Sequence, residues 1–192
     1  MQIKAGIAAL VLTLVAPLAT AEVVDINFGD KSFSAELSGP LPKVRDTGAQ
    51  YDLGVLTRPD DEPEDLLQVH GGFLLTGDAG AQGFDLAAGL GGRLIYIDRG
   101  PLDGGVFAVG GQLEARFPQA DRFSVSAYAF HAPSITAFSD LDGYTEVGGD
   151  IGYEVIRGGS IYIGGRYIRH EYDPAGKETV DNGLHGGLRL KF

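Results

Sequence analysis

The chain has 192 residues, enough for one domain, and its formal net charge is -11 at pH 7. This acidity disfavours a nucleic-acid partner, because binding to phosphates needs clusters of lysine and arginine. Cysteine is absent, which excludes disulfides, thiolate catalysis and zinc–thiolate sites.

The first predicted element is a cleaved signal peptide over residues 1–21. Lys4 gives it a positive start, residues 5–18 are apolar, and Ala19-Thr20-Ala21 is a small-x-small cleavage site. An N-terminal membrane anchor is the alternative, but the apolar run is short for a spanning helix. This interpretation divides the chain into a leader, 1–21, and one mature domain, 22–192.

The mature part contains no uncharged apolar run of the roughly 20 residues that a spanning helix needs. If it lies in a membrane, it must therefore be a closed barrel, because backbone groups in lipid need internal partners. From about residue 31 onward, most segments alternate apolar residues with polar residues or glycine, which is the period of a two-faced strand. The clearest segments are 67–76, 84–96, 107–117, 146–155, 161–167 and 184–192, with fainter candidates at 32–38, 48–57 and 122–131.

The number of strands is the least certain part of this pattern. The candidates above make an odd number, whereas single-chain bacterial barrels have an even number of strands. Either residues 23–28 form one more strand or one weak candidate is not a strand. We therefore predict an all-β fold: a single antiparallel up-and-down transmembrane β-barrel with eight or ten strands, ten being favoured.

The connections between these strands differ in length and composition. Short ones are predicted at 77–82, 118–121 and 157–159, and longer polar ones at 58–65, 98–103, 133–143 and 171–177. Outer-membrane barrels have short periplasmic turns and longer outer loops. If Phe192 ends the last strand at the periplasmic rim, all three short turns fall on that rim.

The alternation separates an apolar face, expected to meet lipid, from an inward face that carries both signs of charge. Pairs of glycines inside the strands, such as Gly71-Gly72 and Gly186-Gly187, fit the tight curvature of a narrow barrel. Belt aromatics are expected at Phe84, Phe117, Phe123 and Phe192 near one rim and at Tyr96 and Tyr167 near the other.

We expect the inward charges to form a paired network in the lumen, because an unpaired buried charge is costly. Its predicted members are Asp85, Arg93, Glu114, Arg116, Glu146, Asp150, Glu154, Arg166 and Arg189, and Glu36, Asp52, Asp181, Arg122 and Lys191 share the same face. A barrel of this size is about filled by side chains, which favours a plugged lumen over a selective pore.

The C-terminus carries the most specific motif. His185-x-Gly187-x-x-Leu190-x-Phe192 fits the polar-x-Gly-x-x-apolar-x-aromatic pattern that ends outer-membrane barrels. We expect this segment to be the assembly signal, presenting a last strand for pairing with the barrel-assembly machinery.

No residues satisfy the pattern of a catalytic, cofactor or metal site, and we predict no cofactor. His70, His131, His170 and His185 are scattered, without the i, i+4 spacing of helical zinc motifs. Ser124, Ser126 and Ser134 lie near His131 in sequence, but no nucleophile-elbow signature accompanies them. The acidic loop from Arg58 to Asp65 lacks the regular spacing of a calcium loop, so a solvated loop is expected.

The second half of the chain contains five stretches in a characteristic order: 138–146 (FSDLDGYTE), 152–157 (GYEVIR), 161–168 (IYIGGRYI), 171–173 (EYD) and 180–192 (VDNGLHGGLRLKF). In these stretches the chain resembles the YfaZ family of small outer-membrane proteins. The resemblance is weaker over about 26–75. The resemblance implies an outer-membrane barrel and carries over no catalytic residue.

The leading functional hypothesis is a non-enzymatic outer-membrane barrel with a structural, envelope-maintenance or narrow-pore role. Its expected partners are outer-membrane lipids, lipopolysaccharide and the assembly machinery, and the expected state is a monomer. One alternative is an outer-membrane enzyme that hydrolyses or modifies lipid, which needs Ser or His on the lipid face near a rim. The other is a soluble periplasmic barrel that binds a small apolar ligand, which requires a polar exterior and an apolar lumen.

Overall fold

A computed structural model describes most of residues 22–192. The described residues are 22–42, 44, 47–58, 66–80, 83, 85–173 and 176–192. The predicted signal peptide, residues 59–65 of the acidic loop and Phe84 lie outside them. Among the described residues, no helix has both the length and the apolar character needed to cross a membrane.

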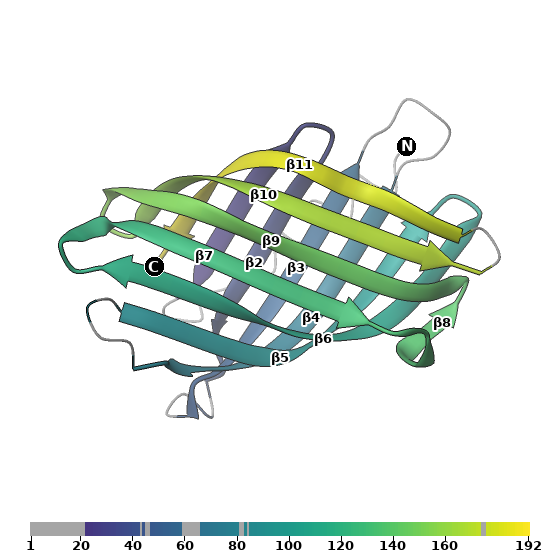
Figure 1. The fold of residues 1–192 in the computed structure, drawn as a ribbon, viewed down its shortest axis with the longest axis horizontal. Helices are drawn as coiled ribbons and strands as arrows, with labels where there is room; N and C mark the ends of the chain where they lie inside the picture. The colour runs from purple at the N-terminus through teal and green to yellow at the C-terminus, as the bar shows by residue number, and fades with distance from the viewer. Residues whose placement is uncertain are drawn as a thin grey trace.

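Ten long strands in the described part of the chain close into one antiparallel barrel (Figure 1). They are β1 (Val23–Gly29), β2 (Phe33–Pro40), β3 (Ala49–Arg58), β4 (Leu66–Asp78), β5 (Asp85–Arg99), β6 (Leu102–Phe117), β7 (Ala120–Ala132), β9 (Leu141–Ile156), β10 (Gly159–Tyr172) and β11 (Gly176–Lys191). Each pairs with its neighbours in the chain, and β11 pairs with β1 to close the ring. The predicted ten-stranded up-and-down barrel is confirmed, with residues 23–28 in β1.

One short strand lies outside this ring. A 3-10 turn at Ser134–Thr136 leads into β8 (Ala137–Ser139), which pairs with the start of β6. The loop between β7 and β9 is thereby held against the barrel wall, and Phe138 covers Gly105 of β6.

The two rims of the barrel are distinguished by where the chain ends. At the terminal rim, the backbone N–H of Glu22 donates to the carbonyl of Phe192 at 3.0 Å. The strand ends joined by the three predicted short connections, β4 to β5, β6 to β7 and β9 to β10, lie on this rim, as predicted. We call the opposite end the far rim.

The predicted contrast in loop length holds only in part. The connection at 41–48, between β2 and β3, lies on the terminal rim although it is long. The long loop predicted at 98–103 is wrong, because Asp98 pairs with Asp103 and Arg99 with Leu102. Gly100, at a φ of 58°, makes a tight turn there, a conformation that glycine adopts without steric cost.

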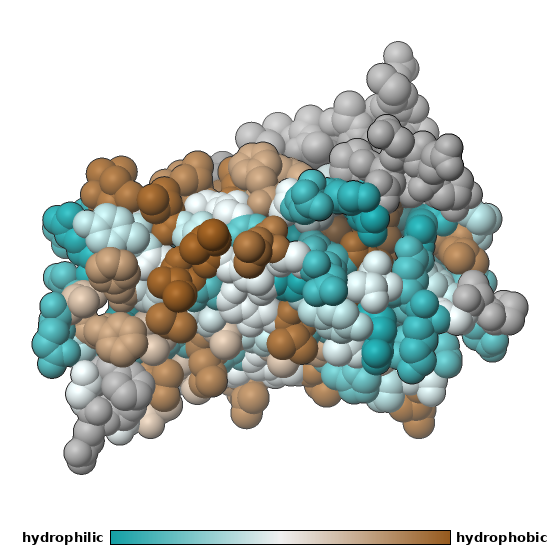
Figure 2. Space-filling view, turned by 45° about the horizontal axis from the view of Figure 1, so that its top comes forward, coloured by the Kyte–Doolittle hydropathy of each residue, from teal (hydrophilic) through white to brown (hydrophobic). Residues whose placement is uncertain are grey.

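The outer surface of the barrel is strongly apolar. Leu90 is 74% exposed and Leu184 is 72% exposed, and every long strand except β2 contributes at least one exposed large apolar side chain. Figure 2 shows hydrophobic side chains gathered over the left part of the surface and hydrophilic ones toward the right. On β6, Phe107 and Phe117 are ten steps of about 3.3 Å apart on a strand tilted by about 40°, so the apolar belt between them is ~25 Å high.

The interior has two layers. Near the far rim, apolar side chains from most strands meet across the lumen, and Ile97, Val106 and Ile168 are 0% exposed. The layer also includes Leu56, Leu66, Ile95, Ala108, Phe130, Ala132, Leu141, Tyr144, Tyr172 and Val180. The predicted network of paired charges thus shares the lumen with apolar packing: charged groups occupy chiefly the part nearer the terminal rim, and apolar side chains fill the far part.

Candidate functional site

Arg93 of β5 is the centre of the largest charge cluster on the inner face. It is buried, and its Nε is ion-paired with Asp52 Oδ2. Its Nη2 lies 3.5 Å from Glu36 Oε2, and its Nη1 lies 3.7 Å from Glu146 Oε2. The guanidinium also stacks over the Phe130 ring, 4.1 Å from the centroid, where a cation is attracted by the ring face. One arginine thus holds three carboxylates at the boundary with the apolar layer.

Two other inward arginines form separate ion pairs. Arg189 Nε lies 2.9 Å from Asp25 Oδ2, and its Nη2 lies 3.2 Å from Asp150 Oδ2. Arg166 Nη2 lies 2.8 Å from Asp181 Oδ2. These contacts tie β11 to β1, β9 and β10, so they hold the closure of the ring as well as neutralise charge.

The predicted network members fall into three groups. Arg93 meets Glu146 and Arg189 meets Asp150, both in the interior. Arg116 meets Glu114 at 3.1 Å and Glu154 at 3.7 Å, but this group is half exposed near the terminal rim. Arg166 takes Asp181 as its partner, and Asp85, exposed at the start of β5, has no ion pair with any described residue.

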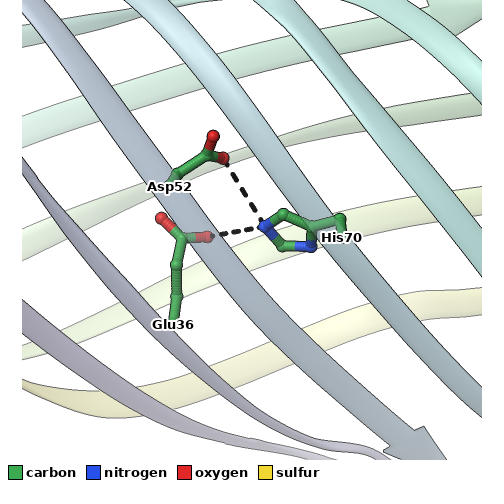
Figure 3. A group of neighbouring side chains, drawn as sticks. All are labelled: Glu36, Asp52 and His70. Carbon is green, nitrogen blue, oxygen red and sulfur yellow. Dashed lines mark ion pairs between the residues drawn. The ribbon is translucent and has the colours of Figure 1, made fainter. Parts of the chain in front are cut away.

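A second feature, not predicted from the sequence, adjoins Arg93. Glu36, Asp52 and His70 come from the neighbouring strands β2, β3 and β4, and their polar ends converge inside the barrel (Figure 3). His70 Nε2 lies 3.6 Å from Glu36 Oε2 and 3.5 Å from Asp52 Oδ2. The Asp52 side chain is 2% exposed and that of His70 is 11% exposed, whereas Glu36 remains 36% exposed.

Strand register and two glycines create the space for this cluster. Gly54 is the register partner of Glu36 on one side and of His70 on the other. The imidazole of His70 occupies the space that a side chain at position 54 would fill. A Cβ on Gly54 would lie 2.2 Å from His70 Cε1, and a Cβ on Gly72 would lie 1.9 Å from Asp52 Oδ1. Any larger residue at either position would displace a member of the cluster.

The cluster carries excess negative charge. Three carboxylates, Glu36, Asp52 and Glu146, share the single guanidinium of Arg93. With His70 neutral the group has a formal charge of 1 − 3 = -2, and with His70 protonated it has -1. Because buried net charge is costly, either a proton or a bound cation would stabilise this arrangement.

A chain of hydrogen bonds continues from Glu146 into the apolar layer. The Tyr144 hydroxyl donates to Glu146 Oε2 at 2.7 Å, and the Gln68 amide donates to the Tyr144 oxygen at 3.0 Å. His170 Nε2 lies 3.1 Å from Gln68 Oε1, and its Nδ1 lies 3.1 Å from the Tyr172 hydroxyl. Each side chain in this series of hydrogen bonds has a partner. The fully buried His170 is therefore explained by a structural role.

The remaining candidate residues do not form a catalytic arrangement. His131 is exposed on the outer face of β7, where its Nδ1 lies 3.1 Å from Thr145 Oγ1. Ser126 points inward and hydrogen-bonds Asp150, so it lies on the opposite face from His131. Ser124 shares the inward face of Ser126 by strand alternation, and His185 is buried edge-on against Tyr162.

The four residues of the C-terminal motif divide between the two faces of β11. His185 is buried, and a Cβ on Gly187 would lie 2.4 Å from the Tyr162 ring, so both are inward. Leu190 and Phe192 are exposed on the apolar outer surface. In the closed barrel the strand is paired on both sides, by β1 and β10; its role as an assembly signal remains a prediction.

Comparison with known proteins places the chain in a family. A family model described as YfaZ precursor matches residues 2–192, nearly the whole length. The chain belongs to the YfaZ family. The resemblance seen in the second half of the sequence is thus confirmed, and it extends over the first half as well.

Solved structures similar to this YfaZ family member are barrels of low sequence identity. The outer membrane channel DcaP of Acinetobacter baumannii matches with 10% identity and a TM-score of 0.38, over 93% of this chain and 60% of that one. A NanC porin structure matches with 11% identity and a TM-score of 0.36, over 90% of this chain and 98% of that one. The chain therefore spans less than two thirds of the channel's length. A search of curated proteins finds no match.

Proposed function

We propose that the mature chain spans a bacterial outer membrane as a closed barrel that does not conduct, with a structural or envelope-maintenance role. The observation that carries this proposal is the combination of an apolar exterior with a lumen closed by side chains. Lipids and lipopolysaccharide would be its partners in the membrane.

The exterior supports a membrane location. Soluble monomers rarely expose contiguous apolar patches larger than a few hundred Å², whereas here exposed apolar rows recur around the barrel. The belt of ~25 Å between Phe107 and Phe117 matches the apolar band of outer-membrane barrels, which is flanked by aromatic girdles. Tyr96 near the far rim and Phe123 near the terminal rim extend these girdles. The predicted signal peptide supports export.

The interior supports a closed lumen. Ile97, Val106 and Ile168 have no solvent-accessible surface, which supports a lumen closed at their level by packed side chains. The narrow-pore alternative would require the apolar layer to open. Ion conduction through the barrel with this layer packed as described would contradict the proposal.

The other two alternatives receive less support. A soluble barrel with an apolar ligand inside needs a polar exterior, and the exposed leucines, isoleucines and valines are the reverse of that. A lipid-modifying enzyme needs a nucleophile near a histidine on the lipid face. Ser126 lies on the opposite face of β7 from His131.

Two measurements test the proposal. After a carbonate and urea wash, the protein is expected to stay in the outer-membrane fraction, and unboiled samples are expected to migrate differently from boiled ones on a gel. In planar bilayers, the purified protein is expected to add no steady conductance. Release by the wash would refute the membrane location, and reproducible single-channel steps would refute the closed lumen.

A further inference from the structure

We propose that Glu36, Asp52 and His70 bind one divalent transition-metal cation on the inner face of the barrel, with Zn²⁺ the best match. The site is formed by the fold alone, so this inference does not depend on where the protein is located.

The spacing of the three polar ends fits metal ligands better than direct hydrogen bonds. The separations of 3.5 and 3.6 Å between His70 Nε2 and the two carboxylate oxygens exceed the 2.7–3.2 Å of an N–H···O bond. Two ligand atoms that each lie about 2.1 Å from a tetrahedral zinc ion are ~3.4 Å apart. All three ligand atoms lie within 4.8 Å of one another, so small shifts would place them around one ion.

Unpartnered buried atoms point to the same site. Asp52 is almost fully buried, and neither of its carboxylate oxygens makes a hydrogen bond of acceptable geometry with a described residue. His70 Nε2 is also buried without a hydrogen bond of acceptable geometry. Buried polar atoms normally have partners, so such atoms in a native fold call for an explanation such as a bound ion.

The charge and the donor types select the kind of cation. A dication would bring the formal charge of -2 on Glu36, Asp52, Glu146 and Arg93 to zero. One imidazole with two carboxylates suits zinc and its neighbours rather than calcium or magnesium, which prefer oxygen ligands alone. Arg93 keeps Glu146 and the Phe130 ring as partners if Asp52 turns toward the ion.

We expect a hydrated ion to reach the site from the side of the terminal rim, because Glu36 is its most exposed member. Inward side chains are solvent-exposed there, as at Glu114 and Arg116, and exposure persists as far as Glu36. Toward the far rim, the side chains of the apolar layer are buried. Glu36 is thus the ligand that meets the ion first, and Asp52 and His70 complete the site from the buried side.

The test uses the mature chain, refolded in detergent micelles and titrated with ZnCl2 by calorimetry in a buffer that does not chelate metal. We expect one Zn²⁺ per barrel and a rise in unfolding temperature on binding. The variants H70Q and D52N should each weaken binding at least tenfold. The control is H131Q, which removes an exposed histidine from the outer face and should bind as the unmodified chain does.

A spectroscopic measurement separates ligation from a purely structural role. Co²⁺ bound in place of zinc should give visible absorption bands of a low-coordinate site, and these bands should disappear in H70Q. The gel-shift of unboiled samples shows whether each variant is folded. Absence of stoichiometric metal binding by the unmodified chain, or unchanged binding and spectrum in folded H70Q, would overturn the proposal.

Discussion

Replacing Arg93 by methionine tests the charge cluster most sharply. Met keeps much of the apolar stem that packs on Phe130 but removes the only guanidinium shared by Glu36, Asp52 and Glu146. Removing one partner of a buried ion pair costs about 3–5 kcal/mol, because the other charge is left uncompensated. The lost cation–π contact adds to the same loss and is worth about 0.5–2 kcal/mol when desolvated. We therefore expect R93M to lower the free energy of unfolding by about 3.5–7 kcal/mol.

The assay is equilibrium unfolding in urea of the barrel refolded into lipid vesicles, followed by tyrosine fluorescence and gel-shift. The matched control is R116M. Arg116 and Glu114 form an ion pair in which each side chain is 46% exposed, and exposed ion pairs stabilise a fold by about 0–1 kcal/mol. The double variant D52N/R93M should recover part of the loss, with a coupling energy of about 0.5–3 kcal/mol. If R93M costs no more than R116M, the reasoning about the cluster is refuted.

Three further substitutions probe the packing around this cluster and the outer surface. Gly72→Ala should destabilise the barrel by about 1–3 kcal/mol, because its Cβ would overlap Asp52 Oδ1. Gly71→Ala should be close to neutral in the same urea assay, because its Cβ would lie 3.4 Å from Leu53 Cδ2, an ordinary van der Waals contact. Ile163→Lys, in the apolar belt, should cost about 2–4 kcal/mol in vesicles, and Asn182→Lys, outside it, about 0–1 kcal/mol; equal costs would contradict the placement of the belt. Phe130→Ala should cost about 3–5 kcal/mol and loosen the apolar layer, so bilayer recordings should show more frequent conductance bursts than for the unmodified chain.

The ring of strands was predictable because alternation is a local property. On β6, the outward Phe107, Val109 and Leu113 alternate with inward residues, so the sequence alone predicts which side meets apolar surroundings. The tenth strand at residues 23–28 followed from the even count of such barrels.

The apolar layer inside the barrel was not predicted, although β5 carries a sign of it. Residues 94–97 are Leu-Ile-Tyr-Ile, where the alternation of β5 gives way to a continuous apolar run. A strand that is apolar on both faces indicates burial on both faces. The inward Ile95 and Ile97 are indeed fully buried while Leu94 and Tyr96 are exposed outside.

The cluster of Glu36, Asp52 and His70 could not be predicted because it depends on strand register. Glu36 and Asp52 were placed on the inward face, but whether they meet His70 depends on how β2, β3 and β4 are aligned. That alignment is set by the connections between these strands, and a shift of one residue would turn each side chain to the other face. Arg166 likewise takes Asp181 as its partner, and no pattern of charges along the sequence distinguishes that choice.

Which face of the strands meets lipid can be measured directly, because a chain without cysteine accepts single labelling sites free of background. Ser124→Cys and Val125→Cys place a fluorophore on successive residues of β7, inward and outward respectively. In vesicles that contain lipids with brominated acyl chains, the label at Val125 should be strongly quenched and the label at Ser124 should not. Stronger quenching at Ser124, or equal quenching at both, would contradict a barrel with its apolar face in the membrane and its charges enclosed.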